Sequence, residues 1–320
     1  MEGIAPASGL ISFCVPVYNA GAFIKETLRC LCSQDYPYFE IIVVDDGSTD
    51  DSRRQIEAIA DKRVTLLCTQ NGGAAMARNV AYRNSKGAYV IFFDADDIVP
   101  PCYLRKMIQK ITEKSVVMAR WGRFYNNDLS SYAPETLHKK EMDFLEWIGY
   151  YWKNGNSMTN PGRALIPRSL IDEAGGWNES LSLNDDFEFF TRIFLCANKI
   201  ILNDEALFYY RSGVNGLSAG KSDKAYRSYY NSVALSLEKV FKRYGNEAAL
   251  LKSCANIWQL FIYSAYPHEP ELVKMAEEEI KNLGGASLPF PSGKLTSLLA
   301  KFVGWKLAMK TRLYFRAFTT

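Results

Sequence analysis

Short apolar runs alternate with helically spaced apolar positions over the first 115 residues of the chain. The runs predict four buried strands, at 10–16, 40–44, 64–68 and 89–93. The helical spacing predicts the helices that follow them, at 20–34, 48–60, 73–85 and 101–114. Strands and helices that alternate in this way are typical of βαβ units and a mostly parallel sheet. In such sheets, ligands bind at the carboxyl ends of the strands.

The pattern is more mixed from residue 116 to 218 and mainly helical from residue 221 onward. In the mixed part we expect helices at 143–152 and 184–196, and strands at 115–120, 200–202 and 206–210. In the helical part we expect breaks at 267–270 and 284–291, where Pro and Gly gather. The sequence therefore predicts an α/β domain followed by a helical extension.

Acidic residues cluster where two of the expected strands end and where one helix begins. The clusters are Asp45-Asp46, the stretch 94–97, and Asp185-Asp186. Like charges this close repel each other by about 1 kcal/mol per pair in water, and by more when shielded from it. A divalent cation offsets such repulsion, and Mg²⁺ or Mn²⁺ prefers oxygen ligands. The alternative interpretation is that these are polar turns and helix N-termini, where acidic residues are favoured in any case.

Composition narrows the class of protein. With 48% hydrophobic and 23% charged residues, the chain is ordinary for a globular protein and is neither disordered nor collagen-like. Its seven scattered cysteines do not form a disulfide framework, and two histidines argue against zinc chemistry. The N-terminus lacks the basic stretch of a signal peptide, and no run of 18 apolar residues occurs. We therefore expect a cytoplasmic protein without a transmembrane helix.

The net charge of +3 is unevenly distributed along the chain. Residues 281–320 hold seven bases and no acid, which leaves 31 bases against 35 acids, or −4, in residues 1–280. Within 294–316, bases accompany apolar residues at helical spacing. Such a helix suits the interface of an anionic membrane, where each base contributes about 1 kcal/mol. It would hold the protein peripherally on the inner face of the cell membrane. Alternatively, the helix packs on the acidic body of the protein itself.

A series of motifs in fixed order carries a resemblance to a known family. They are Val-Pro-Val-Tyr-Asn at 15–19, Asp-Asp-Gly-Ser-Thr-Asp at 45–50, Ala-Arg-Asn at 77–79, Asp-Ala-Asp-Asp at 94–97, Gly-Gly-Trp-Asn-Glu-Ser-Leu at 175–181, Asp-Asp-Phe-Glu at 185–188, Tyr-Tyr-Arg at 209–211, and Ser218. In this order and spacing, they resemble the bacterial family 2 nucleotide-sugar glycosyltransferases of GT-A fold. The resemblance covers about residues 10–218.

The resemblance implies a fold, a division of the chain and an activity. The fold is a Rossmann-like, mostly parallel mixed sheet flanked by helices. The expected GT-A domain is 1–218, with a nucleotide-binding half at about 10–115 and an acceptor half at about 116–218. Residues 219–320 form the helical extension with its basic tail. The implied enzyme is an inverting transferase of hexosyltransferase type. It moves a sugar from a nucleoside-diphosphate donor, expected to be a UDP-sugar, to a hydroxyl of a glycan or lipid-linked glycan.

On the donor side, the resemblance assigns roles to residues in the first half of the domain. Pro16, Tyr18 and Asp46 would line the base and ribose site, with Asp46 accepting a hydrogen bond from a base N–H. Arg78 would lie near the nucleotide, or else form a salt bridge on the helix surface. Asp94 would contact the ribose or a metal-bound water.

The resemblance also assigns the metal and the catalytic base. The stretch 94–96 looks like the family's DXD motif, so Asp96 would bind Mn²⁺ or Mg²⁺, while Asp97 would support the loop or the acceptor side. Asp186 matches the general base, and Asp185 stands where Glu is usual, next to the acceptor. Trp177 would flank the acceptor or simply pack in the core.

A departure from the family pattern occurs after the last strand. Gly213 stands where many relatives have a His two residues after the Arg, so a metal or diphosphate contact from this loop is in doubt. Arg211, Asn215 or Ser218 could take its place.

Two competing functions remain at this point. One is a dinucleotide-dependent oxidoreductase, against which the first strand–helix turn speaks, because it has no Gly-x-Gly-x-x-Gly. The other is a noncatalytic relative, against which the joint presence of Asp94, Asp96 and Asp186 speaks. The basic tail carries no nucleic-acid-binding motif, so we expect no nucleic-acid partner.

Overall fold

A computed structural model describes residues 9–137, 139–213, 222–292, 300 and 302–317, with side chains up to residue 311 in the last range. The chain divides into two compact units, which are described separately. The first comprises Met1–Glu146 with Met158–Gly220, and the second Trp147–Ser157 with Lys221–Thr320. The division after residue 220 lies two residues from the expected end of the α/β domain. Residues 147–157, in contrast, group with the C-terminal helices.

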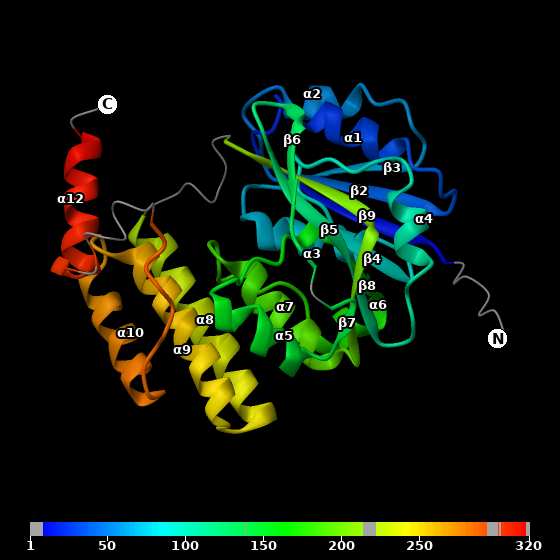
Figure 1. The fold of residues 1–320 in the computed structure, drawn as a ribbon. Helices are drawn as coiled ribbons and strands as arrows, with labels where there is room; N and C mark the ends of the chain where they lie inside the picture. The colour runs from blue at the N-terminus through cyan, green and yellow to red at the C-terminus, as the bar shows by residue number, and fades with distance from the viewer. Residues whose placement is uncertain (1–8, 138, 214–221, 293–299, 301, 318–320) are drawn as a thin grey trace. The chain divides into compact units, whose positions relative to one another are not determined.

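A mixed sheet forms the centre of the first unit (Figure 1). In the described residues its strands are β1 (Ile11–Val17), β2 (Phe39–Asp45), β3 (Val64–Cys68), β4 (Tyr89–Phe92), β5 (Ser115–Tyr125), β6 (Asp128–Pro134), β7 (Glu141–Met142), β8 (Ala164–Pro167) and β9 (Lys199–Ser212). Their order is β3-β2-β1-β4-β8-β5-β9-β7, with β6 paired to β5.

The strand directions bring several strand ends together. Strands β1 to β4 pair in parallel, and so do β5 and β9. Because β8 runs antiparallel to both β4 and β5, the two parallel groups point the same way. The carboxyl ends of β1, β2, β4, β5 and β9 therefore lie at one edge of the sheet, hereafter the carboxyl edge. This is where the fold class places a ligand.

The strand side chains alternate between the two faces of the sheet, as the period of a strand requires. On one face, Phe13 and Phe93 pack in a core with the apolar stripes of α1 (Ile24–Cys32) and α4 (Tyr103–Ile108). On the other, α3 (Ala74–Asn84) lies along β1 and β2. There Phe92 meets Trp177 edge-on, at 5.3 Å between ring centroids. The sheet is thus covered on both faces, so its apolar runs are buried.

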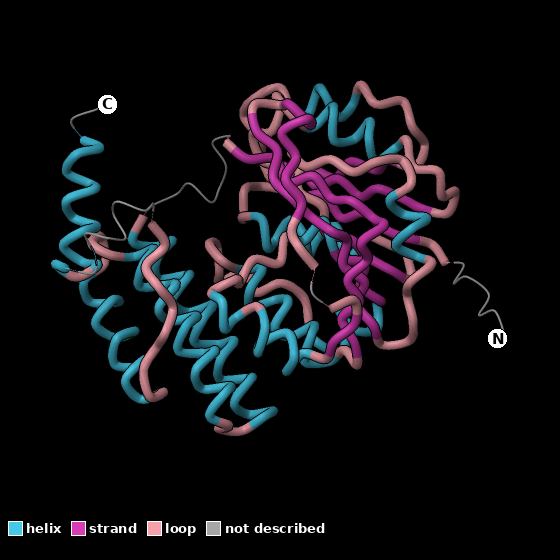
Figure 2. Tube along the Cα trace, in the orientation of Figure 1, coloured by secondary structure: helices cyan, strands magenta, loops and turns pink. Residues whose placement is uncertain are grey.

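The remaining helices of this unit connect strands or lead to the carboxyl edge. They are α2 (Ser52–Glu57), α6 (Arg168–Ala174), α7 (Asp185–Cys196) and the short 3₁₀ helix η2 (Pro161–Arg163). Helix α5 (Phe144–Tyr150) begins in the first unit and ends in the second. Figure 2 shows how the strands gather in one layer while the helices lie outside it.

The expected strands of the second half differ from the observed ones in a definite way. Two strands were expected at 200–202 and 206–210, but β9 is continuous. Asn203 pairs with Ala119 and Leu207 with Arg120, so residues 204–206 bulge out of an otherwise regular ladder. The acidic pair at 204–205 is exposed on this bulge, which is why it interrupts the apolar run without ending the strand. Strands β6, β7 and β8 and helix α6 were not predicted.

The second unit is helical in its described residues. It contains the 3₁₀ helix η1 (Trp152–Asn154) and the helices α8 (Asp223–Tyr244), α9 (Ala248–Ala265), α10 (Pro270–Asn282) and α12 (Trp305–Ala317). The expected breaks at 267–270 and 284–291 are confirmed. A break between α8 and α9 was not expected. No helix in the described ranges is long and apolar enough to span a bilayer.

Part of the basic tail packs within this second unit. The Trp305 ring lies 4.9 Å from that of Tyr263 and 5.3 Å from that of Tyr266. Lys306 forms an ion pair with Glu277 at 2.6 Å. In contrast, Phe302 is 81% exposed. Residues 293–299 and 301, which carry much of the expected amphipathic stretch, lie outside the described residues.

Candidate active site

The loops that follow β1 and β2 are joined by hydrogen bonds at the carboxyl edge. The Asn19 side chain accepts a hydrogen bond from the Thr49 main-chain N–H at 2.8 Å, and the Asp50 carboxylate accepts one from Gly21 N–H at 2.9 Å. Tyr18, which follows β1 and precedes Asn19, is 45% exposed. An exposed ring on a fixed loop can stack against a planar ligand.

Asp46 is buried, and its carboxylate organises the next loop. One oxygen accepts the main-chain N–H of Gly72 at 2.9 Å, and the other accepts that of Gly73 at 2.8 Å. The Thr69 hydroxyl adds a third hydrogen bond, at 3.2 Å. Each carboxylate oxygen therefore already has a partner within the protein. The expected hydrogen bond to a nucleotide base stays a prediction, and in this structure Asp46 shapes the loop instead.

Arg78 connects two of the acidic clusters. It projects from α3 and donates to Asp94 at 2.8 Å and to Asp185 at 3.0 Å. Its guanidinium also lies 4.3 Å over the Trp177 ring. Arg78 thus forms salt bridges, as the alternative interpretation expected, but only 8% of its side chain is exposed, so they are buried and not on the helix surface. The arginine links the end of β4 to the start of α7.

Asp96 lies close to Asp94 but has no cationic side chain bound to it. Among the described residues, no other residue donates a hydrogen bond to its carboxylate. Burial, together with the negative charge of Asp94, raises the pKa of Asp96 to about 6. A carboxylate in this position would gain from a nearby cation.

Asp97 is buried below the same loop. One carboxylate oxygen accepts the Arg211 main-chain N–H at 2.9 Å, while the other has no partner among the described residues. Burial, with the charges of Asp96 and Asp94, raises the pKa of Asp97 well above its usual value. Asp97 thus supports the loop from within, in line with the role expected for it.

Each side-chain nitrogen of Arg211 contacts another residue of the protein, and one of them holds the stretch 94–97. Its Nε donates to the Asp96 carbonyl at 2.6 Å, and its two terminal nitrogens contact Glu26 and Asn127. Its guanidinium also lies 5.1 Å over the Phe23 ring. Arg211 therefore supports the Asp loop and is committed to protein contacts. Gly213 has a positive φ of 83°, and the loop beyond it, with Asn215 and Ser218, lies outside the described residues.

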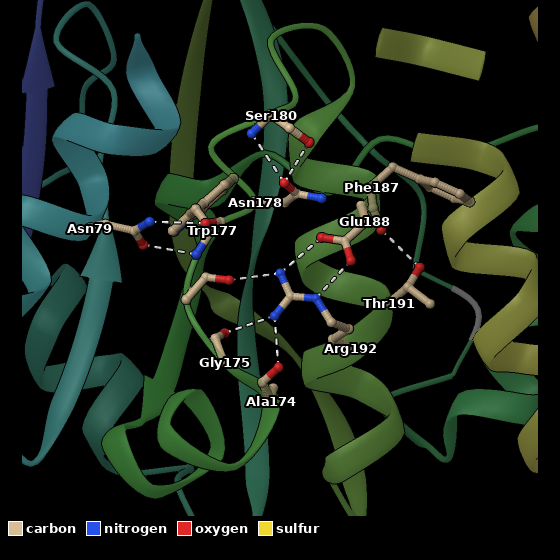
Figure 3. A network of polar contacts seen from close by, with 11 residues as sticks. Asn79, Ala174, Gly175, Trp177, Asn178, Ser180, Phe187, Glu188, Thr191 and Arg192 are labelled. Atoms are coloured by element: carbon tan, nitrogen blue, oxygen red, sulfur yellow. Dashed lines mark hydrogen bonds and ion pairs between the residues drawn. The ribbon is translucent and has the colours of Figure 1, made fainter. Parts of the chain in front are cut away.

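The segment that precedes α7 is fixed by a polar network (Figure 3). Asn79 forms two hydrogen bonds with the Trp177 main chain, and Arg192 donates to the carbonyls of Ala174, Gly175 and Gly176. These contacts explain the two glycines. Gly175 has a φ of +85°, and a Cβ on Gly176 would lie 2.7 Å from the Asn79 oxygen.

Trp177 is itself buried and stacks on Phe189 at 4.1 Å between ring centroids. Of the two roles considered for it, packing is the one that the structure favours. Its contact with Arg78 places it beneath the arginine that joins the acidic clusters.

Asp186 lies in the first turn of α7, next to Asp185. Its carboxylate accepts the Phe187 main-chain N–H at 2.9 Å and lies 3.5 Å from the Thr159 hydroxyl. Burial and the charge of Asp185 raise the pKa of Asp186 to about 7, although Arg78 opposes the shift. A carboxylate with such a pKa can accept a proton near neutral pH.

The donor set fits a divalent cation bound together with phosphates. Among the described residues, no three His, Cys, Asp or Glu side chains gather as a complete metal site. Mg²⁺, however, usually takes only one or two carboxylates and completes its shell with water and substrate phosphates. Asp96, which has no cationic partner, and the second oxygen of Asp94 are carboxylate ligands of this kind.

Sequence reasoning missed several residues that shape the site. Thr159, Asn79 and Glu26 contact the expected residues but belong to no acidic cluster. Asn79 alone carried a signal, because it stands in the Ala-Arg-Asn motif. The other contacts join residues far apart in the chain, such as Glu26 and Arg211.

Comparison with known proteins points in the same direction. The family model for glycosyl transferase family 2 matches residues 12–175. The glycosyltransferase GlyG of Streptococcus pneumoniae is 33% identical over 64% of this chain and 71% of its own length. The poly(ribitol-phosphate) β-N-acetylglucosaminyltransferase TarS of Staphylococcus aureus is 30% identical over 62% of this chain. That match spans about a third of TarS, at 35%.

Solved structures show the same fold. TarS residues 1–349 in complex with UDP-GlcNAc align with a TM-score of 0.67 over 86% of this chain and 81% of that one, at 22% identity. A mannosyltransferase from Pyrobaculum calidifontis, in complex with GDP-Man and Mn²⁺, aligns with a TM-score of 0.56 over 98% of this chain and 87% of that one, at 19% identity.

Proposed function

The chain belongs to glycosyl transferase family 2, and we propose that it moves a sugar from a UDP-sugar to a hydroxyl of a glycan or lipid-linked glycan, with inversion at the anomeric carbon. The family assignment confirms the prediction of a glycosyltransferase, and the solved structures confirm the GT-A fold. The two alternatives, an oxidoreductase and a noncatalytic relative, are therefore not pursued. One observation carries the proposal. Arg78 ties Asp94, at the end of β4, to Asp185, the neighbour of Asp186.

The donor occupies the nucleotide-binding half of the carboxyl edge. The exposed Tyr18 offers a ring to the base, beside Pro16 and the loop that Asp46 holds. Asp94 and Asp96 lie at the end of β4, where the diphosphate would meet them. The relatives support a UDP-sugar in particular, because the TarS structure holds UDP-GlcNAc.

Asp94 and Asp96 would hold Mn²⁺ or Mg²⁺ together with the donor phosphates. When bound, the cation supplies Lewis-acid stabilisation of the charge that develops on the leaving diphosphate. Arg78 keeps Asp94 in place, and Arg211 fixes the main chain of Asp96. The chain thus positions both carboxylates before the ligand arrives.

Asp186 acts as the general base. It takes the proton from the acceptor hydroxyl as the acceptor oxygen forms a bond to the anomeric carbon. The bond between that carbon and the diphosphate oxygen breaks in the same displacement, and the electron pair leaves with the nucleoside diphosphate. A positioned base of this kind contributes typically about 10²–10⁴-fold to the rate.

The C-terminal tail would place the enzyme on an anionic membrane, in keeping with a lipid-linked acceptor. Phe302 and Leu307 are exposed next to Lys306 and Lys310, which supports contact with a membrane interface. The packing of Trp305 and the Lys306–Glu277 ion pair agree with the alternative, a helix that packs on the protein's own surface. Flotation of the full chain with anionic vesicles tests the proposal, with Phe302→Ser/Leu307→Ser as the comparison. Equal recovery of both proteins in the vesicle fraction would contradict it.

A thermal-shift panel tests the proposed function directly. UDP-, GDP-, dTDP- and CMP-sugars are compared with and without Mn²⁺. A donor at 100 times its Kd should stabilise the protein by about 2.7 kcal/mol. We expect a Mn²⁺-dependent shift with a UDP-sugar. No metal-dependent shift with any of the four nucleotides would count against the proposal.

A further inference from the structure

Arg123 is a cation at the carboxyl edge that has only neutral partners. It lies near the C-terminal end of β5, and its side chain is partly exposed. The guanidinium donates one hydrogen bond to the Ser212 hydroxyl at 2.9 Å and one to the Met158 sulfur at 3.2 Å. Neither partner carries a charge, and the thioether is only a weak acceptor. No ion pair among the described residues includes Arg123. Its positive charge is therefore available to a ligand.

Among the arginines of the first unit that are at least partly buried, this arrangement is unusual. Its buried arginines in the described residues, Arg78, Arg163 and Arg211, each pair with a carboxylate. Arg120 and Arg168 lack such a pair, but both donate to main-chain carbonyls. Arg123 uses neither kind of acceptor, although a guanidinium carries five donors.

Two aromatic rings hold the Arg123 guanidinium in place. Its central carbon lies 5.1 Å from the centroid of the Tyr210 ring and 5.7 Å from that of Trp121. Such cation–π contacts orient the planar group without neutralising its charge. The arginine is thus held ready, which lowers the conformational cost of binding a ligand.

The surroundings of Arg123 connect it to both parts of the catalytic machinery. In the ladder between β5 and β9, Arg123 pairs with Tyr210, the neighbour of the loop-holding Arg211. On the other side its Met158 partner precedes Thr159, whose hydroxyl lies 3.5 Å from the Asp186 carboxylate. Arg123 therefore lies between the strand that ends in Arg211 and the segment that contacts the Asp186 carboxylate.

The segment that contains Met158 and Thr159 offers a second unused donor. Asn160 is 4% exposed, and its side-chain nitrogen has no hydrogen-bond partner in the described structure. Its φ of 34° is rare for a residue other than glycine. Strain of this kind, held in place by surrounding structure, often marks a functional segment.

We propose that Arg123, together with the segment 158–160, binds an anionic group of the acceptor, a phosphate or a carboxylate. The inference rests on the proposed glycosyl transfer and deepens it, since it gives the acceptor a charge. Arginine suits both groups, because its planar fork can form two parallel hydrogen bonds to the oxygens. The donor diphosphate has the same chemistry, so the experiment must separate the two sources.

Methyl phosphate serves as the probe, observed by saturation-transfer-difference NMR with the donor site filled by UDP and Mg²⁺. We expect binding to the wild type in the presence of UDP. Arg123→Gln should weaken the binding of methyl phosphate by about tenfold or more, because a charge-assisted contact is lost. The affinity of Arg123→Lys should lie between those of the wild type and Arg123→Gln. Arg83→Gln is the matched control, because Arg83 is an exposed arginine on α3 that forms no ion pair among the described residues. It should bind the probe like the wild type.

Three results would overturn the assignment. In the first, the wild-type protein does not bind methyl phosphate. In the second, UDP displaces the probe. In the third, Arg123→Gln binds the probe as tightly as Arg83→Gln does. Displacement by UDP would assign Arg123 to the donor diphosphate. Titration of UDP with Mg²⁺ into the same variants separates a failure of the Arg123 assignment from a failure of the proposed function. UDP should bind all of them alike, and failure of UDP to bind the wild type would count against the donor site itself.

Discussion

Replacing Asp186 with Asn should raise stability and abolish activity at the same time. Burial and the Asp185 charge raise the pKa of Asp186 from 3.8 to about 7, so the folded state prefers the protonated acid. In the unfolded chain the group ionises near pH 4. As pH rises from 4 to 7, the folded protein therefore loses stability relative to the unfolded chain, and above pH 7 the loss is constant. Asn, which stays neutral, avoids this loss.

The size of the effect follows from the two pKa values. Each unit of difference corresponds to about 1.4 kcal/mol, which sets a ceiling of about 4 kcal/mol. Asp186 is half-buried, so solvent screens part of the effect, and about 2 kcal/mol is the expected gain in the free energy of unfolding at pH 8. At pH 4 the variant and the wild type should be nearly equal.

The assay is thermal or urea unfolding of both proteins at several pH values between 4 and 8.5. Asp128→Asn is the control, because Asp128 is exposed and hydrogen bonds from Ser130 lower its pKa. That variant should show no gain at high pH. In parallel, UDP release from the donor should fall by at least about 10²-fold in Asp186→Asn. A stability difference that does not change with pH, or a variant that turns over normally, would refute the assignment of Asp186.

Further predictions concern the residues that hold the site together. Wild-type kcat/KM should fall about tenfold per pH unit below pH 7, as Asp186 takes up its proton, and a flat profile from pH 5 to 8 would exclude it as the base. Arg78→Met should cost about 3–5 kcal/mol in urea unfolding, because it leaves Asp94 and Asp185 without their cation, and a loss below 1 kcal/mol would show that the pairs contribute little. Asn79→Ala should lower the free energy of unfolding by about 1–3 kcal/mol, because it removes two hydrogen bonds to the Trp177 main chain and one to the Glu179 carboxylate, and unchanged stability would contradict the network of Figure 3.

Much of the first half of the fold could be predicted because its signals are local. The strand at 64–68 has the expected bounds, and α3 differs by one residue at each end. Buried parallel strands leave continuous apolar runs, and the turns between them need Asp, Gly and Asn. The missed β8 has only four residues, and it pairs with strands that are distant in sequence. A run that short cannot be told from other apolar segments by its period.

The site was predictable as a set of carboxylates but not as a set of contacts. Motif order indicated Asp94, Asp96 and Asp186, because their chemistry needs acids at strand and helix ends. Nothing in the sequence shows that Asp46 uses both oxygens on the amides of its own loop. The Glu26 contact of Arg211 likewise joins residues 185 positions apart, so it arises only when the chain has folded.

Calorimetric titration of UDP, with and without Mn²⁺, into wild type, Asp96→Ala and Asp186→Asn tests most directly the separation between donor carboxylates and base. UDP should bind the wild type more tightly with Mn²⁺. Asp186→Asn should keep this affinity within about threefold, since the base does not contact the donor phosphates. Asp96→Ala should lose the Mn²⁺-dependent part, about tenfold or more for one metal ligand. Absence of Mn²⁺-dependent binding in the wild type, or equal losses in both variants, would contradict this division of roles.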